Sequence, residues 1–147
     1  MAKIRHIALS VPDPEKAAKF YEEVFGLKRV GITESVLASG VYLTDGYLNV
    51  ALLNYKTDEM AGGVGEKDRA GAHHFGFVVD DALATRKKIE AAGGSFFMDL
   101  PALKDTLYYE EKFRDPTGVI FDITQNGWAM EPEEEQVAAP EKAHAAR

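Results

Sequence analysis

The segment AHHFGFVVDD, residues 72–81, decides how this chain is organised, because IRHIALSVPD, residues 4–13, repeats its pattern. Each segment holds a histidine, continues with alternating small and apolar residues, and ends on an acidic residue where a helix would begin. A separation of 68 positions relates three pairs of landmarks: His6 and His74, Asp13 and Asp81, and Gly26 and Gly94. Three pairs at one separation predict an internal repeat of two modules rather than a solenoid, which needs three or more units.

The first module has the pattern of one strand, one helix and three further strands. Residues 3–11 alternate between two faces, as a strand requires. Asp13 and Pro14 are typical of a helix start, and Gly26 is typical of a helix end. The apolar stripe between them, at helical spacing, consists of Ala17, Phe20, Tyr21, Val24 and Phe25. The three further strands are predicted over residues 27–34, 37–44 and 47–55.

The second module repeats this order after a polar, glycine-rich linker at residues 56–71. Its predicted elements are a strand over 72–79, a helix over 81–92, and strands over 95–100, 107–114 and 119–125. The sequence therefore predicts a single structural domain with its modules at 1–55 and 72–125, followed by a C-terminal tail at 126–147. The acidic and Ala-rich part of that tail, residues 131–147, is expected to be a loose tail or an extra surface helix.

The composition argues against several classes of partner. The chain has 147 residues, of which 46% are apolar, enough for an ordinary core. Its formal net charge of −7 argues against nucleic acid or an anionic membrane as a partner. It has no cysteine for disulfides or thiol chemistry, and no apolar run long enough for a signal segment or a membrane span. We therefore expect a cytoplasmic protein that acts on a small molecule.

Strand parity places one histidine of each module on a face with otherwise small side chains. The two sets that share a face are His74 with Gly76 and Val78, and His6 with Ala8 and Ser10. The opposite face of the second strand is bulky and is expected to lie against the helix. Two small-lined faces, each with a histidine, would build the floor of a cavity. We therefore favour His74 over His73 as a ligand and expect His73 to be a hydrogen-bonded neighbour.

Asp122 is an acidic side chain within the apolar run at residues 119–125. A buried carboxylate is costly unless it is paired or bound to a metal. The residues alone therefore leave two alternatives, a metal ligand or a partly exposed carboxylate at a sheet edge. A single histidine on a strand is likewise more often structural than a ligand. Taken together, His6, His74 and Asp122 would give two neutral imidazoles and one carboxylate, a set that suits first-row divalent ions.

Three stretches of the sequence also occur in a familiar order. They are HIALSVPD at 6–13 with AAKFYEEVFGL at 17–27, HHFGFVVDD at 73–81, and RDPTGVIFDI at 114–123. Together they resemble the vicinal oxygen chelate superfamily, which includes glyoxalase I, methylmalonyl-CoA epimerase, extradiol dioxygenases, and fosfomycin and bleomycin resistance proteins. The resemblance implies an α+β fold in which two βαβββ modules form a cleft around one divalent metal, and commonly a homodimer. Asp122 matches the final metal ligand, which is usually glutamate in the superfamily.

The resemblance implies a fourth ligand in glyoxalase- and epimerase-like members, a Glu or Gln on the last strand of module one. Here the repeat separation points to Asn54 and the apolar run points to Leu52, and neither is acidic. A three-ligand set leaves positions open for a chelating substrate and dioxygen, as in extradiol dioxygenases. We therefore favour Fe(II) as the cofactor, with Mn, Ni, Co or Zn as alternatives.

Candidate catalytic side chains lie on the strand predicted over 107–114. Those that could polarise a substrate oxygen or dioxygen are Tyr109, Glu110 and Lys112, with Tyr108, Tyr42 and Tyr55 as further candidates. The alternative for each is an ordinary sheet edge with solvated charges. Trp128, just after the last predicted strand, would either cover the cleft or anchor the tail.

Three hypotheses follow for the function. The first is a metal-dependent enzyme of the dioxygenase type that acts on a small oxygen-chelating substrate. The second is a glyoxalase- or epimerase-like lyase or isomerase, in which water or a glutamate such as Glu110 or Glu111 takes the role of base. The third is a non-catalytic protein that binds a small molecule such as a drug. In each case we expect a homodimer, with or without exchange of modules between chains.

Overall fold

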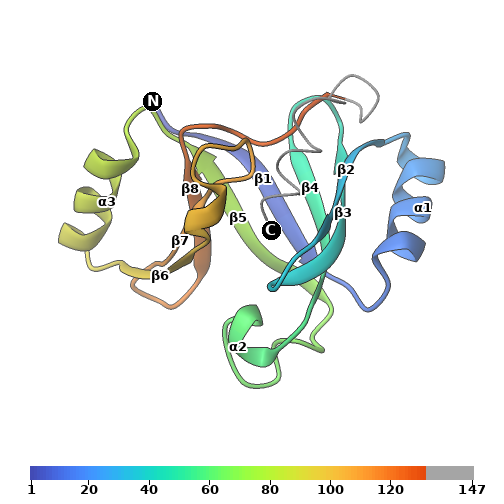
Figure 1. Ribbon diagram of the computed structural model, residues 1–147, viewed down its shortest axis with the longest axis horizontal. Helices are drawn as coiled ribbons and strands as arrows, with labels where there is room; N and C mark the ends of the chain where they lie inside the picture. Colours follow the sequence, from blue (N-terminus) through green and yellow to red (C-terminus); the bar gives the residue numbers. More distant parts are fainter. Residues whose placement is uncertain (132–147) are drawn as a thin grey trace.

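The computed structural model describes residues 1–131, whose strands form one mixed sheet with α1 and α3 lying on opposite sides of the molecule (Figure 1). The strands are β1 Lys3–Ser10, β2 Lys28–Glu34, β3 Ala38–Thr44, β4 Asn49–Tyr55, β5 Gly71–Val78, β6 Ser95–Asp99, β7 Glu111–Arg114 and β8 Ile120–Thr124. The helices are α1 Pro14–Phe25, α2 Asp58–Ala61 and α3 Ala82–Ala91, with a 3-10 helix at Pro101–Leu103. The part of the tail at 132–147, predicted as loose or helical, lies outside the described residues.

The two modules join edge to edge at the centre of the sheet. The strand order is β2-β3-β4-β1-β5-β8-β7-β6, so each half has the same internal order around its first strand. Strands β1 and β5 pair antiparallel with each other, while β4 runs parallel to β1 and β8 runs parallel to β5. Each half therefore has the order βαβββ, which confirms the predicted α+β fold with two such modules.

The predicted helix signals act in both modules. The side chain of Asp13 accepts a hydrogen bond from the backbone N–H of Lys16 and caps α1, and Asp81 caps α3 in the same way through Ala84. Helix α1 ends at Gly26, which adopts a left-handed conformation with φ 68°. This conformation favours glycine, so the end of the helix follows directly from the sequence.

Helix α1 contacts the sheet through fewer of its apolar side chains than their helical spacing in the sequence predicts. Ala18 is fully buried against the core of β3 and β4, and Tyr21 is partly buried beside it. Phe20, Val24 and Phe25 belong to the predicted stripe, yet 54%, 56% and 66% of their surfaces are exposed. The small side chain of Ala18 lets the helix approach the strands closely, so the bulkier side chains lie to the side of the contact.

The strand predicted over 107–114 is wrong in its first half, because β7 begins only at Glu111. Residues 104–110 instead form turns that follow the 3-10 helix. Leu103 and Tyr108 are buried there in a small apolar cluster, against which Tyr42 of β3 packs. The hydroxyl of Thr106 donates to the carbonyl of Leu103 and closes one of these turns. The burial of these side chains competes with strand pairing and holds the segment against Tyr42 of β3.

The linker at 56–71 contains the short helix α2, which the sequence did not predict. Thr57 caps it through the backbone N–H of Met60, and Ala61 at its end is fully buried. The carbonyl of Ala61 then accepts a hydrogen bond from the ring of His73, 2.6 Å away. Among residues 1–131, no helix has the length and apolarity needed to cross a bilayer.

Candidate metal and catalytic site

A single cavity gathers most of the polar residues that the sequence singled out. The space between its lining residues is about 650 Å³, a volume that includes open solvent at its mouth. Both modules contribute to its wall, which consists of His6, Thr33, Ser35, Leu37, Ala38, Tyr42, Ala51, Leu53, His74, Met98, Asp99, Leu100, Leu103, Tyr108, Glu110, Lys112 and Trp128. Most of the wall is apolar, and its charged side chains are Asp99 and, near the two histidines, Glu110 and Lys112. Such a wall suits a small ligand that is oriented by a few polar contacts.

His6, His74 and Asp122 lie together beside this cavity. One ligand atom of each lies within 4.8 Å of the others, and all three side chains are buried. The strand register explains this proximity, because Gly76 of β5 pairs with His6 of β1 on one side and with Asp122 of β8 on the other. Asp122 is fully buried, so the alternative of a partly exposed carboxylate at a sheet edge is wrong.

Asn49 fixes which ring nitrogen of His6 carries the proton. The Nδ2 group of Asn49 donates to the carbonyl of Ala129 at 3.0 Å, which turns its Oδ1 toward the His6 ring. Nδ1 of His6 lies 2.9 Å from that oxygen and must therefore donate to it. In a neutral ring this leaves a lone pair on Nε2, which lies 3.8 Å from Oδ2 of Asp122. An outer hydrogen bond of this kind is typical of metal-binding histidines.

His73 fixes the proton of His74 in a comparable way. Nε2 of His73 donates to the carbonyl of Ala61, so its Nδ1 carries a lone pair. Nδ1 of His74 lies 2.7 Å from that atom and donates to it, which leaves a lone pair on Nε2 of His74. That nitrogen is 3.0 Å from Oδ2 of Asp122. Burial, and then the charge of Lys112, lowers the pKa of His74 well below its usual value, which favours the neutral ring.

The contact between His73 and His74 departs from strict strand alternation. The pairing of β1 with β5 shifts between Ala8, which faces His74, and Leu9, which faces Ala72. This irregularity leaves His73 out of register and turns it toward its neighbour. The hydroxyl of Tyr55 lies 3.1 Å and 3.4 Å from the Nδ1 atoms of the two rings. His73 thus lies beside the ligand set as a hydrogen-bonded neighbour rather than within it.

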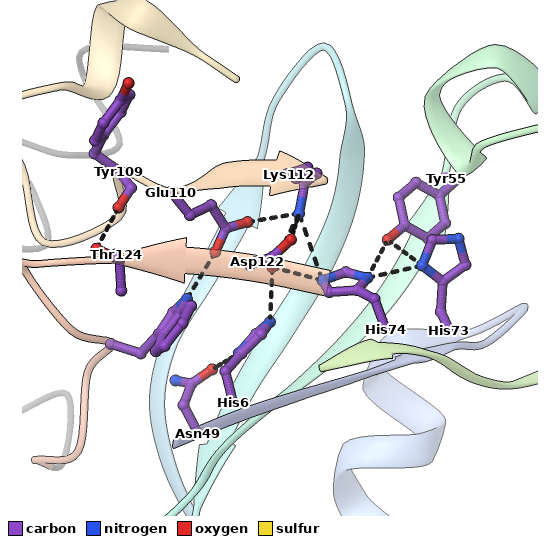
Figure 2. Close-up of polar contacts among 11 residues, drawn as sticks. His6, Asn49, Tyr55, His73, His74, Tyr109, Glu110, Lys112, Asp122 and Thr124 are labelled. Carbon is purple, nitrogen blue, oxygen red and sulfur yellow. Dashed lines mark hydrogen bonds and ion pairs between the residues drawn. The ribbon is translucent and has the colours of Figure 1, made fainter. Parts of the chain in front are cut away.

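Lys112 lies inside the same group of residues, as Figure 2 shows. Its side chain is 7% exposed, and its Nζ is 3.0 Å and 3.1 Å from the two oxygens of Asp122. Nζ also donates to Glu110 at 2.8 Å and lies 3.4 Å from Nε2 of His74. Burial opposes the charge, but the carboxylates of Asp122 and Glu110 outweigh it and raise the pKa of Lys112. The ammonium of Lys112 is thus paired across the strands with the carboxylate of Asp122.

Glu110 and Trp128 complete the polar part of the cavity, whereas Tyr109 does not belong to it. One carboxylate oxygen of Glu110 accepts from Lys112, and the other accepts from the indole N–H of Trp128 at 2.7 Å. The indole stacks on His6, with ring centroids 4.7 Å apart. The Tyr109 hydroxyl instead donates to Asp99, away from the histidines in Figure 2. Burial and that carboxylate raise the pKa of Tyr109 to about 12.

In module one, Ala51 occupies the position that corresponds to Asp122 in module two. The sequence pointed to Leu52 or Asn54 for this position, and both of these predictions are wrong. Gly76, which pairs with Asp122, corresponds to Ala8 in the repeat, and Ala8 pairs with Ala51. Leu52 packs instead in the apolar cluster under α1, and Asn54 donates to the carbonyl of Val11. The separation of 68 residues fails here because the loops between the strands differ in length. The buried methyl group of Ala51 confirms that this position supplies no fourth ligand atom.

The donor set suits a first-row divalent ion. His6 and His74 each direct an Nε2 lone pair toward Asp122, and two imidazoles with one carboxylate are ligands that such ions accept. The side chains that would hold an ion are therefore these three. The ammonium of Lys112 already contacts two of them, which sequence reasoning did not foresee. Its place opposite Asp122 in the β7–β8 pair was the signal that could have revealed it.

Comparison with known proteins gives one family and several related enzymes. The family model for the Glyoxalase/Bleomycin resistance protein/Dioxygenase superfamily matches residues 3–123. A probable lactoylglutathione lyase of Vibrio parahaemolyticus is 31% identical over 130 residues, which cover 84% of this chain and 91% of that protein. An ethylmalonyl-CoA/methylmalonyl-CoA epimerase of Cereibacter sphaeroides is 30% identical over 98 residues, which cover 63% of this chain and 72% of that protein.

Solved structures agree on the fold. Methylmalonyl-CoA epimerase of Streptomyces coelicolor, in complex with 2-nitronate-propionyl-CoA, superposes with a TM-score of 0.66 at 19% identity, covering 82% of this chain and 92% of that one. The epimerase of Mycobacterium tuberculosis gives a TM-score of 0.66 at 15% identity, covering 82% and 85%. At these identities the likeness establishes the arrangement of the strands and helices.

Proposed function

Because this chain belongs to the Glyoxalase/Bleomycin resistance protein/Dioxygenase superfamily, we propose that it is a lyase or isomerase that moves a proton on the carbon next to a carbonyl group. The named relatives are a lyase and an epimerase, which favours this reaction class over the dioxygenase chemistry predicted from the three-ligand set. The single observation that carries the proposal is a carboxylate, Glu110, held next to a buried cation in the cavity that the two histidines line.

Glu110 is the base in this proposal. Removal of a proton next to a carbonyl needs a positioned base, and Glu110 has a side chain that lines the cavity and is 21% exposed. Glu111, the other glutamate considered from the sequence, pairs with Arg86 of α3 and is not part of the cavity wall. Partial burial beside Arg86 raises the pKa of Glu111. Of these two neighbouring glutamates, only Glu110, which comes just before β7, lines the cavity.

The ammonium of Lys112 stabilises the charge that proton removal creates. When the carboxylate of Glu110 takes the proton, the electron pair of the C–H bond passes to the carbonyl oxygen, which becomes an enolate oxygen. A fixed positive charge close to this oxygen favours the step. Return of the proton to the neighbouring carbon, or to the other face of the same carbon, gives the isomerised product. A divalent ion held by His6, His74 and Asp122 would take the place of the ammonium beside these ligands and would supply Lewis-acid polarisation of the same oxygen.

The proposed substrate is a small thioester or the hemithioacetal that precedes one. This class is drawn from the names of the related lyase and epimerase. The apolar wall formed by Leu37, Leu53 and Leu103 would hold the alkyl part, while the polar part holds the carbonyl end. Iron was favoured only through the dioxygenase hypothesis, so an ion bound for this reaction would come from the set Mn, Co, Ni, Zn and Fe(II).

The test is exchange of the substrate proton with solvent in D₂O, followed by NMR. The substrates are the glutathione hemithioacetal of a 2-oxoaldehyde and a 2-substituted malonyl-CoA. The wild type is expected to exchange at least one of them, and Glu110→Gln to lower the rate by about 10²- to 10⁴-fold. Glu111→Gln is the matched control and is expected to retain the wild-type rate. No exchange in the wild type, or equal loss in both variants, would contradict the proposal.

The dioxygenase alternative keeps one supporting observation. Ala51 at the fourth position leaves a set of three ligands, with room for a substrate and dioxygen on an iron ion. The measurement that separates it is oxygen uptake by anaerobically Fe(II)-loaded protein with a panel of catechols. Uptake that depends on Asp122 would favour this alternative, and its absence across the panel would remove it.

The predicted homodimer and cytoplasmic location remain predictions. The proposed chemistry does not depend on a second copy, because β1, β5, β7 and β8 of one chain supply His6, His74, Lys112 and Asp122. Exchange of modules between chains, left open by the length of the linker, is therefore not needed to assemble the site.

A further inference from the structure

We propose that the ammonium of Lys112 is the resident cation of the site formed by His6, His74 and Asp122, and that a divalent metal can bind there only by displacing it. The inference rests on the same cavity as the proposed function, but it concerns which cation the site holds rather than which reaction follows. It would make the native site complete without a metal.

The first support is the direction of the lone pairs. The hydrogen bonds of Asn49 and His73 leave both Nε2 atoms without a proton, as described above. Nε2 of His74 then lies 3.0 Å from a carboxylate oxygen of Asp122, so two acceptors face each other in a buried place. Such an arrangement is unfavourable unless a donor or a positive charge lies beside it. The site therefore requires a donor or a positive charge beside these two atoms.

The second support is that Lys112 meets this requirement fully. An ammonium has three N–H donors and no acceptor. Nζ of Lys112 has acceptors on three side chains: Glu110 at 2.8 Å, the two oxygens of Asp122 at 3.0 Å and 3.1 Å, and Nε2 of His74 at 3.4 Å. The atoms of Asp122 and His74 that would bind a metal are thus the acceptors of Lys112. The two cations would compete for the same lone pairs.

The third support is the balance of charge. Ala51 stands where the repeat would place a second ligand carboxylate, so the set has a single negative ligand, Asp122. The Lys112 ammonium neutralises that ligand and is 7% exposed. Lys112 and Asp122 are direct partners in the β7–β8 pair, so the strand register holds the ammonium next to this carboxylate. A divalent ion that bound without displacing the ammonium would therefore add two positive charges next to one that already neutralises Asp122.

The test is the affinity for Co²⁺, measured by titration calorimetry and by the visible absorption of the bound ion, on metal-free protein. The wild type is expected to bind weakly, and Lys112→Met to bind one Co²⁺ per chain on the order of 100-fold more tightly. Lys112→Arg keeps the charge and is expected to remain weak. Lys88→Met, the same replacement on exposed α3, is the matched control and is expected to behave as the wild type.

A wild-type chain that binds one Co²⁺ as tightly as Lys112→Met would overturn the inference, whatever either protein catalyses. If Lys112→Met proves unstable without metal, its thermal unfolding is compared with and without Co²⁺. A rise in Tm that is large in the variant and absent in the wild type supports the inference. A rise of equal size in both contradicts it. Proton exchange in D₂O is measured separately, so this inference can fail while the proposed function stands.

Discussion

At the scale of single residues, the site depends on side chains that hold the proton positions of the histidines. Asn49 and His73 each receive one Nδ1–H and thereby direct the Nε2 lone pairs of His6 and His74 inward. Neither side chain lies in the ligand set, yet both decide whether the two rings can accept a cation. The chemistry of the cavity is therefore set by hydrogen bonds one layer outside it.

Asn49→Ala is expected to destabilise the protein by about 1–3 kcal/mol, because it leaves two buried groups without their partners. The groups are Nδ1 of His6 and the carbonyl of Ala129. The measurement is the free energy of unfolding in urea. Asn54→Ala removes one partly buried hydrogen bond to Val11 and serves as control, with an expected loss of about 0.5–1.5 kcal/mol. Equal losses would mean that the Asn49 contacts carry no special weight.

At the scale of elements, the register of β5 brings the site together. Gly76, near the middle of β5, pairs with His6 of β1 on one side and with Asp122 of β8 on the other. The missing side chain leaves the space that Trp128 fills, since a Cβ at this position would lie 2.6 Å from the indole ring. The segment after β8 can therefore return across the sheet and place Trp128 against His6.

Gly76→Ala is expected to displace the indole of Trp128 and to cost about 1–3 kcal/mol through overpacking. Trp128 is the chain's one tryptophan, so its fluorescence reports the displacement as a shift toward longer wavelength. Gly63→Ala is the control, because the nearest atom to a Cβ there is a flexible Glu66 carbon 3.7 Å away. An unchanged emission spectrum in Gly76→Ala would show that Trp128 does not depend on this glycine.

At the scale of the whole molecule, surface turns in both modules contain aspartates whose charged carboxylates are stabilised by hydrogen bonds within the turn. The backbone N–H of Leu48, and then that of Tyr47, lowers the pKa of Asp45. The hydroxyl of Thr117, helped by the N–H of Val119, lowers the pKa of Asp115. In the unfolded chain these groups take up protons at a higher pH than in the folded chain. Their contribution to stability is therefore present above about pH 4 and is lost as the pH falls.

The double variant Asp45→Asn, Asp115→Asn is expected to lose less stability than the wild type between about pH 5 and about pH 3, because asparagine does not titrate. The measurement is the urea midpoint at each pH, with the difference between the two pH values compared across proteins. An identical fall in wild type and variant would mean that these turns do not contribute to acid unfolding.

The sequence by itself determined the two-module architecture and the identity of the three side chains that converge on one point. The patterns that carried this prediction are local: alternation along the strands, the helix caps at Asp13 and Asp81, and the repeated histidines. The folded structure contains each of them where the sequence predicted it. It also indicated Glu110 and Lys112 as candidates, although it assigned them together with Tyr109 to one continuous strand.

Only the tertiary structure decided what lies around those three side chains. The place of Ala51 depends on the register between β1 and β4, and the contact of His73 with His74 depends on an irregularity between β1 and β5. The turns at 104–110 depend on burial of Tyr108 beneath a distant strand. The position of Lys112 depends on its pairing with Asp122 of β8. Each of these is a pairing between segments far apart in the chain, where loop length and side-chain packing set the register and no local pattern records it.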